Sequence, residues 1–431
     1  MALNYTLKQT EEKKIVDGGF LIYDSLFLNV LGITSEYKTL ESIQDFIKLI
    51  NSADFTYIDS RVVDADYFLK EINNFNSSSF TSNIRKIDFY FNYILDALHY
   101  NYTIHLINAT NENNVYFTIN EKNLDYLVYD PLKTSISANF INEIKLKAIP
   151  ILFNASLREN SFLPLENSYI VSNVTDISTQ FDNFYLRPEL TDSDFNQLSF
   201  TIGGVKRSKR YYSDDNISDD SEYSNSPYVL IPLLSDIAGM MARSYSLYPW
   251  ISIAGIQNGK ILNQKFSKIN LPNINYSEDI IPSTPTNITF SSNSKLNVAQ
   301  TRAINSVLKL SSIGIKEYFL ATNLSGITST SNDIKKTFSY STLYADIVKK
   351  SKSTITEYLF EQNTPEIRAE IKQKFDLFLE EIKTNNGIES FLVICDETNN
   401  TNESISTNKL VIDINFKPVQ SKAVISLNFT T

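Results

Sequence analysis

The sequence contains few of the residues that build disulfide frameworks, metal sites and glycine-rich loops. Of its 431 residues, one is cysteine, two are histidine and 11 are glycine. A single cysteine excludes an intrachain disulfide framework and a cysteine-based zinc site. No run of 18 apolar residues occurs, and residues 1–14 are polar, with Glu11 and Glu12 among the lysines, which is unlike a signal peptide. We therefore expect a soluble protein made in a reducing cytoplasm.

Positive charge is also scarce relative to negative charge. The chain has 39 basic and 49 acidic residues, which gives a formal net charge of −10. A chain of this sign has no global attraction for a phosphate backbone, so we expect no direct contact with nucleic acid. Its length and its 42% content of hydrophobic residues are enough for at least two buried cores.

No set of residues converges on a metal site or a reactive nucleophile. His99 and His105 would need further ligands at metal spacing, and none is evident, so structural roles are favoured over metal binding. Cys395 ends an apolar strand without a histidine nearby in sequence, which favours a buried thiol over a nucleophile. The sequence therefore predicts neither an enzyme nor a metal site.

Two further patterns that could suggest chemistry have simpler interpretations. Gly255 and Gly259 lie in a loop, but no Gly-Lys-Ser/Thr follows, so a phosphate-binding loop and a bound cofactor are not expected. Ser235 and Asp236 could be imagined as a catalytic pair. Their position at the predicted start of a helix favours capping and stabilisation of the helix dipole instead.

Helices and strands alternate along the first 200 residues, which predicts an α/β or α+β fold. The expected strands are residues 2–8, 20–30, 103–107, 115–119, 126–129 and 148–153, and the expected helices are residues 38–50, 59–74, 84–100 and 136–147.

Changes in composition and breaks in the sequence pattern divide the chain into five parts. The expected parts are an N-terminal arm (1–19), an outer α/β domain (20–205), an exposed charged loop (206–225), a C-terminal core domain (226–408) and a C-terminal arm of strands (409–431). The charged loop is predicted because a basic block, Lys206 to Arg210, precedes an acidic block, Ser213 to Glu222, with hardly any aliphatic residue.

The C-terminal part has well-marked helix ends. A helix is predicted at about 340–360, and a second begins with Thr364 as N-cap before Pro365 and closes at Asn385 to Gly387. A strand follows at 391–395. The last residues alternate between apolar and polar in two strands separated by Pro418.

One stretch of the C-terminal half resembles the sheath protein of contractile phage tails. That family's C-terminal domain has a proline, a helix of the form Asp-(aliphatic)-Ala-Gly-x-x-Ala-Arg, and then a Trp-x-x-x-Ala-Gly loop. The residues here at those places are Pro232, Asp236, Ala238, Gly239, Ala242, Arg243, Trp250, Ala254 and Gly255.

A second patch has the same resemblance. Phe360-Glu-Gln-Asn363 is similar to the family's Phe-Glu-Pro-Asn, with Gln362 in place of proline, and Cys395 to Asn400 is similar to its Cys-Asp-x-x-x-Asn turn, which assigns Asp396 and Asn399 to the motif. The segment 409–429 then follows the family's strand, proline and final strand. The matches together span residues 225–431 in the right order, and residues 1–200 carry no motif of this family.

The resemblance implies an α/β (α+β), multi-domain fold. Its C-terminal sheath core domain would have a mixed sheet flanked by helices, with extended N- and C-terminal strands that complete sheets between subunits. The implied partners are other copies of the chain in six-fold helical rings, a tail tube protein, and baseplate, terminator and neck proteins, without nucleic acid or membrane insertion. The implied location is the virion tail, after assembly in the cytoplasm of the host bacterium.

Alternative functions remain open at this stage. The same fold would serve the sheath of a bacterial contractile injection system, such as a type VI system or a phage-tail-like particle. A secreted adhesin or surface-layer protein could share the richness in Asn, Thr and Tyr, but it would need an export signal.

Three groups of residues are predicted to act between molecules. Alternating strands at chain ends expose unpaired backbone groups, so intersubunit pairing is assigned to the arms through Leu3, Tyr5, Leu7, Ala423, Ile425, Leu427 and Phe429. Lys349, Lys350 and Lys352 form either a solvated face or, as the resemblance implies, a contact with the tube. Arg243 either complements its helix dipole or binds a carboxylate across an interface.

Overall fold

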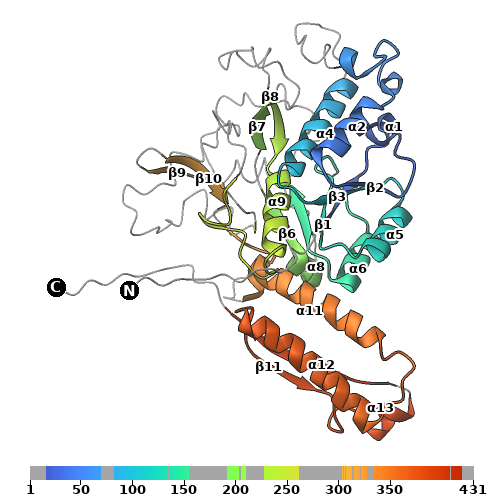
Figure 1. Cartoon of the computed structure of the whole chain (residues 1–431), viewed down its shortest axis with the longest axis vertical. Coiled ribbons are helices and arrows are strands. Elements are labelled where there is room, and N and C mark those ends of the chain that lie inside the picture. Colours follow the sequence, from blue (N-terminus) through green and yellow to red (C-terminus); the bar gives the residue numbers. More distant parts are fainter. Residues whose placement is uncertain are drawn as a thin grey trace, which may run out of the picture.

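The computed structural model describes most of the chain. The described residues are 16–68, 82–133, 135–154, 192–202, 205–209, 228–261, 303, 305, 307–312, 315–320, 322–327, 334–407 and 409–419. Within them, Figure 1 shows a part built around a sheet, a lower part made of α12, β11 and α13, and helix α11 between the two.

A six-stranded mixed sheet forms the centre of the larger part, in the order β2-β3-β1-β4-β5-β6. Its strands are β1 (Asp17–Ile22), β2 (Tyr37–Leu40), β3 (Thr103–Asn108), β4 (Tyr126–Val128), β5 (Ile151–Asn154) and β6 (Ser199–Ile202). Only the edge strand β2 is antiparallel to its neighbour. The α/β class is therefore confirmed, and this mixed sheet lies in the first half of the chain.

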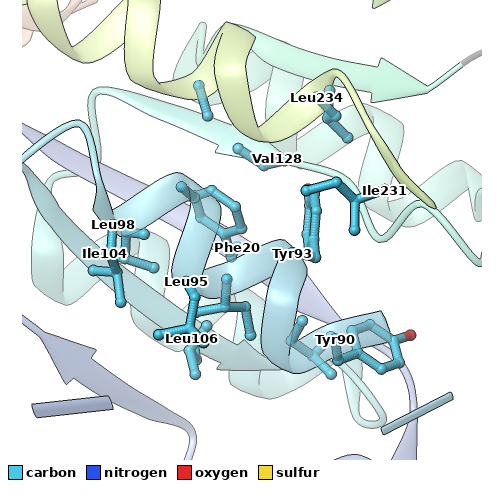
Figure 2. Close-up of a cluster of buried hydrophobic side chains, with 14 of the residues drawn as sticks. Phe20, Tyr90, Tyr93, Leu95, Leu98, Ile104, Leu106, Val128, Ile231 and Leu234 are labelled. Atoms are coloured by element: carbon cyan, nitrogen blue, oxygen red, sulfur yellow. The ribbon is translucent and has the colours of Figure 1, made fainter. Parts of the chain in front are cut away.

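Helices cover both faces of the sheet, as parallel strands joined by crossovers require. One face is covered by α1 (Ser25–Val30), α2 (Ile43–Asn51), α4 (Ser82–Leu98) and α9 (Leu234–Tyr245), and the other by α5 (Glu112–Lys122), α6 (Ala138–Lys147) and α8 (Ser193–Leu198). Figure 2 shows the core on the first face, where Phe20 and Val128 of the sheet meet Tyr93 and Leu95 of α4 and Leu234 of α9.

Helix α9 ties the two sequence regions together. The sequence division places residues 234–245 in the C-terminal core domain, yet α9 packs against β1, β5 and α4. The domain boundaries proposed from the sequence therefore separate segments that share one hydrophobic core.

Two of the predicted elements are shortened or split because a helix starts at a capping residue inside them. The expected strand 20–30 ends at Ile22, because the Asp24 side chain accepts a hydrogen bond from the Phe27 amide and starts α1. The expected helix 38–50 is split into strand β2 and helix α2, whose N-cap is Ser42. The predicted helix 84–100 and the predicted strands at 103–107 and 126–129 are confirmed.

The predicted strand at 115–119 is wrong, because this segment is the middle of helix α5. Its β-branched and aromatic residues favour a strand locally. However, Asn111 caps the helix start, Asn123 ends it in a left-handed conformation, and Val115 and Ile119 lie four residues apart on the buried side. Burial and capping decide the outcome here.

Other expectations are corrected or lie outside the described residues. Of the expected helix 59–74, residues 65–68 are helical, residues 59–64 are in turns and irregular backbone, and residues 69–74 lie outside the described residues. The expected charged loop is partly a strand, because β7 (Val205–Lys209) pairs with β8 (Tyr228–Pro232). Residues 210–225 lie outside the described residues. A second antiparallel pair is formed by β9 (Val307–Ser312) and β10 (Ile315–Leu320).

The C-terminal unit, as we call residues 364–419, packs on α11 (Phe338–Thr356). It contains α12 (Pro365–Thr384), β11 (Ile388–Ile394), α13 (Asn402–Ser406) and β12 (Asp413–Pro418). The predicted cap is confirmed, because the Thr364 side chain accepts from the Ile367 amide. Asn386, with φ +60°, takes the left-handed position that reverses the chain after α12.

Candidate functional site

The motif helix α9 lies directly on the ring of Tyr100, which belongs to the turn after α4. A Cβ built on Gly239 would lie 2.0 Å from Cγ of Tyr100, so only glycine allows this approach. Next to it, the Tyr126 hydroxyl donates to the Ala238 carbonyl at 2.8 Å. These residues hold α9 on the sheet.

Ser235 and Asp236 connect α9 to α4 inside the core. The Ser235 hydroxyl donates to Asp96 Oδ2 at 2.6 Å, and the Tyr100 hydroxyl donates to Asp236 Oδ1 at 2.7 Å. Both are fully buried. The prediction that Ser235 caps the helix is wrong, because α9 begins at Leu234 and Leu233 makes no side-chain cap hydrogen bond. Pro232, also buried, ends β8 just before this turn.

Arg243 holds the loop that follows α9. Its guanidinium lies over the Tyr100 ring, 5.4 Å from the centroid, and donates to the carbonyls of Asn258 and Lys260 at 3.3 and 3.2 Å. In the same loop, the Gly255 amide donates to the Leu320 carbonyl at 2.8 Å, with φ of +96°. Among the described residues, Arg243 thus contacts two carbonyl groups and an aromatic ring. A contact between subunits stays a proposal.

Trp250 links this loop to the C-terminal unit. Its Nε1 donates to the Asn385 carbonyl at 3.1 Å, and its ring stacks on Tyr248. A Cβ on Gly387 would lie 2.9 Å from the indole. The motif tryptophan therefore fixes the turn between α12 and β11 against the rest of the chain.

Asp396 and Asn399 form the turn after β11. Asp396 Oδ1 accepts from the Thr398 amide at 2.8 Å, and Asn399 Oδ1 accepts from the Asp396 amide at 3.1 Å. The Asn399 amide group donates to the Ile394 carbonyl and to Asp413 Oδ2, so it joins the end of β11 to the start of β12. These motif residues have structural roles that are visible in the subunit.

The sheet of the C-terminal unit has two strands. β11 and β12 pair antiparallel, with Ile388 and Val393 buried against α12, and in the part of the chain described here neither strand pairs on its other side. Two-stranded sheets are marginally stable alone, and a free edge is a place for another strand. The arm residues Leu3, Tyr5, Leu7, Ala423, Ile425, Leu427 and Phe429 lie outside the described residues.

The three lysines of α11 have partners within the chain. The Lys349 ammonium donates to the Asn123 carbonyl at 2.7 Å and pairs with Asp125 at 3.0 Å, and Lys352 donates to the Leu146 carbonyl. Both carbonyls end helices, α5 and α6, where a cation is favoured by the helix dipole. Lys350 pairs with Asp346 at 3.1 Å and lies over the Phe378 ring.

These lysines line a cleft between α11 and the ends of α5 and α6. Its volume is about 510 Å³, its apolar wall comprises Ile119, Leu124, Ala148, Ile149, Pro150 and Tyr245, and its polar wall includes Asn123, Asp125, Lys147, Asp346, Lys349, Lys350 and Lys352. Burial, together with the nearby charge of Lys147, lowers the pKa of Lys352. We call this site the lysine cleft.

The carboxyl ends of β1 and β4, where doubly wound folds often bind ligands, hold a buried network instead. Asp130 accepts from the amides of Tyr23 and Leu132 and from the Tyr90 hydroxyl, at 2.8–3.0 Å. Burial raises the pKa of Asp130 to about 6. This carboxyl fixes the loops after the two strands.

The residues weighed for chemistry have structural surroundings. His105 lies between Thr39 and Asp17, at 3.0 and 3.1 Å, and Cys395 is buried, which raises the pKa of its thiol. Among the described residues, no group of three His, Cys, Asp or Glu side chains is arranged to hold a metal ion. No helix in that part of the chain combines the length and apolarity needed to span a membrane.

Comparison of sequences connects the C-terminal part to sheath proteins. Residues 331–430 match the family of the phage tail sheath C-terminal domain. The tail sheath protein of Vibrio phage KVP40 is 27% identical over 202 residues, which is 46% of this chain and 26% of that protein. The tail sheath protein of Enterobacteria phage T4 is 28% identical over 240 residues, 56% of this chain and 31% of that protein. The chain thus spans about a third or less of these relatives.

Comparison of structures extends the likeness to the whole chain. The sheath of the PVC extracellular contractile injection system, in its contracted state, has a TM-score of 0.53 and 11% identity, covering 100% of this chain and 98% of that one. A chain of the six-fold symmetrised anti-feeding prophage baseplate has a TM-score of 0.54 and 10% identity, covering 100% and 99%. The predicted resemblance to contractile sheath proteins is therefore confirmed, in sequence for the C-terminal part and in fold for the whole chain.

Proposed function

We propose that this chain is the structural subunit of a contractile tail sheath. Copies of it polymerise as stacked six-fold rings around an inner tube, and contraction of the sheath drives the tube through the host envelope during genome delivery. The observation that carries the proposal is the match to the phage tail sheath C-terminal domain within a chain that has the sheath fold over its full length. The subunit would lie in the virion tail after assembly in the host cytoplasm.

Sheet completion provides the joint between subunits in this proposal. The two-stranded β11–β12 sheet has a free edge on each side among the described residues. Of the arm 409–431, β12 already pairs with β11 of its own chain, so the strands for exchange are the alternating segments 2–8 and 423–429. Arms from neighbouring copies would pair with these edges through backbone hydrogen bonds. Such joints stay connected while the subunits rotate as rigid bodies.

The function requires neither an active site nor a nucleotide, because the energy is stored in the extended assembly. The partners are other copies of the chain, a tail tube protein, and baseplate, terminator and neck proteins. Contact of Lys349, Lys350 and Lys352 with the tube is part of the proposal. All three lysines already have partners within the subunit, Lys350 through Asp346 at 3.1 Å, so a tube contact would add to these bonds or replace them.

A second candidate is the sheath of a bacterial contractile injection system. The full-length fold likeness to the PVC sheath favours it, whereas the sequence relatives from phages KVP40 and T4 favour the phage tail. The two candidates share the subunit's mechanism and differ in whether a genome passes through the tube.

Electron microscopy of the purified protein tests the function. We expect hollow tubes of contracted type, because without a tube to template the extended lattice the contracted one has the lower energy. A monodisperse monomer at high protein concentration, without tubes or rings in negative stain, would reject the proposal.

A further inference from the structure

The lysine cleft has an excess of positive charge that the described part of the subunit leaves unbalanced. Its two carboxylates are both engaged, Asp125 with Lys349 and Asp346 with Lys350. Lys147 and Lys352 have no carboxylate within salt-bridge distance among the described residues. The lowered pKa of Lys352, caused by burial and by the charge of Lys147, reflects the same excess. An anionic group placed between these two lysines would be stabilised.

The cleft also has an apolar floor. Ile119, Leu124, Ile149 and Tyr245 line it, although each is at least nine-tenths buried in the subunit. A surface that combines an apolar floor with two cations at the rim suits a partner with an apolar side chain flanked by carboxylates. The volume of about 510 Å³ is enough for several side chains but not for a whole helix.

A surface of that chemistry exists on the C-terminal unit of the same chain. Residues 357–407 contain 11 acidic and four basic residues, so most of the chain's net charge of −10 lies in this segment. On α12, Glu370, Leu377 and Glu381 are all exposed, and Leu377 is 67% exposed. At 100° per residue they fall within about 40° of one another, on one helix face. We call these three residues the acidic face of α12.

The two surfaces cannot meet within one subunit. Leu343 and Ile347 of α11 pack against Phe375 of α12, whereas Lys349 and Lys352 point to the other side of α11. Helix α11 therefore stands between the lysine cleft and α12, as Figure 1 shows. A contact between surfaces on different sides of a molecule joins copies head to tail, and such heterologous contacts produce rings or helical assemblies.

We propose that the acidic face of α12 in one copy docks into the lysine cleft of a second copy. Leu377 lies on the apolar floor, and Glu381, one helical turn away, lies between Lys147 and Lys352. Glu370, which accepts a hydrogen bond from the Tyr358 hydroxyl at 2.8 Å and is about 16 Å from Glu381 along α12, adds negative charge beside the cleft. The inference rests on the proposed sheath function for its helical geometry, and it names an ionic contact between subunits in addition to strand pairing. Because the contact is ionic, it weakens as salt concentration rises.

Cross-linking of mixed isotopes tests the contact directly. Unlabelled and ¹⁵N-labelled full-length protein are mixed, dissociated, allowed to assemble and treated with a carbodiimide, which joins an amine to a carboxylate that touches it. We expect mixed-isotope peptides that link Lys352 or Lys147 to Glu381 or Glu370. Links from these lysines only to carboxylates of the same chain, or to other residues of a second copy, would overturn the proposal.

Charge reversal tests its contribution to assembly. Assembly is measured at low salt, about 0.05 M, as the fraction of protein that sediments as assemblies in a centrifuge. Both K147E/K352E and E370K/E381K should lower this fraction about tenfold, and the variant that combines all four substitutions should restore it. K48E, at an exposed lysine of α2, is the matched control. Thermal melting of the unassembled K147Q/K352Q subunit shows whether a loss of assembly comes from the lost contact or from lost folding. Failure of the combined variant to recover while its subunits remain folded would overturn the pairing.

The outcomes also distinguish this contact from the sheath function. If wild-type protein forms tubes and both reversed variants form them equally well, the function stands and the contact is wrong. If wild-type protein forms no tubes or rings but gives the mixed-isotope link, the contact stands and the sheath function fails.

Discussion

Gly239 of α9 lies against the ring of Tyr100, so close that a Cβ would sit 2.0 Å from the ring's Cγ. The Tyr100 hydroxyl simultaneously donates to Asp236, one turn earlier on α9. A glycine and an aspartate of the motif therefore both act in packing α9 against the Tyr100 side chain. Their presence in the sequence reflects the fold of the subunit.

Gly239→Ala should destabilise the subunit by roughly 3 kcal/mol, because the added methyl group must push α9 or Tyr100 out of the core. Chemical denaturation of the unassembled subunit measures this change. Gly32→Ala is the control: Gly32 has φ +65° but open space around its Cβ, so only the backbone strain of about 1 kcal/mol applies. Equal effects of the two substitutions would contradict the close packing.

The stability of the subunit should depend on pH through Asp130. Because burial raises the pKa of this carboxyl from 3.8 to about 6, its contribution is complete below about pH 4 and is lost as pH rises through 6. Between pH 4 and pH 7 the loss amounts to about 3 kcal/mol. Asp130→Asn should remove this part of the slope, so that the variant loses more stability relative to wild type at pH 4 than at pH 7. A wild-type slope retained in the variant would show that other groups cause it.

Much of the local structure follows from the sequence. The caps Thr364 and Pro365 and the apolar period of α12 predict that helix correctly, as the period of 84–98 predicts α4. Segment 115–119 shows the limit, since its strand-forming residues become helical through caps at Asn111 and Asn123. The order of the six strands in the sheet likewise cannot be predicted from any local sequence pattern.

The roles of the motif residues could be predicted less well. Asp236 and Tyr100 are 136 residues apart, and Ser235 and Asp96 are 139 apart, so no spacing rule brings them together. A serine before an acidic residue at a helix start indicates an N-cap. Here the serine makes a buried hydrogen bond to Asp96 instead, because α4 lies against α9. The resemblance located the important residues, whereas the structure supplies their contacts.

Removal of the arms should separate assembly from folding. Deletion of residues 1–14, or a stop before Lys422, should abolish tube formation, because each lost strand takes several backbone hydrogen bonds, worth a net ~1 kcal/mol each, from every joint. Thermal melting of the truncated subunit should remain cooperative, because neither deletion removes a described helix or core strand. Normal tubes from both truncations would reject strand exchange.

Lys349 should be important for the subunit itself, whether or not α11 also contacts a tube. Its partner Asp125 has a side chain that is only 4% exposed, so Lys349→Gln leaves a buried carboxylate without its cation and should lower stability by roughly 2–3 kcal/mol. Lys383→Gln removes an exposed pair with Glu380 on α12 and should change stability by less than about 1 kcal/mol. Denaturation of both variants measures the difference. A tube-binding assay on Lys350→Gln tests the tube contact separately. This variant leaves the Lys349–Asp125 pair intact but removes the cation beside Asp346, whose side chain is 6% exposed, so thermal melting must first show that the subunit is folded. Weaker, salt-sensitive binding by the folded variant supports the contact, and unchanged binding at low salt assigns Lys350 to the subunit surface alone.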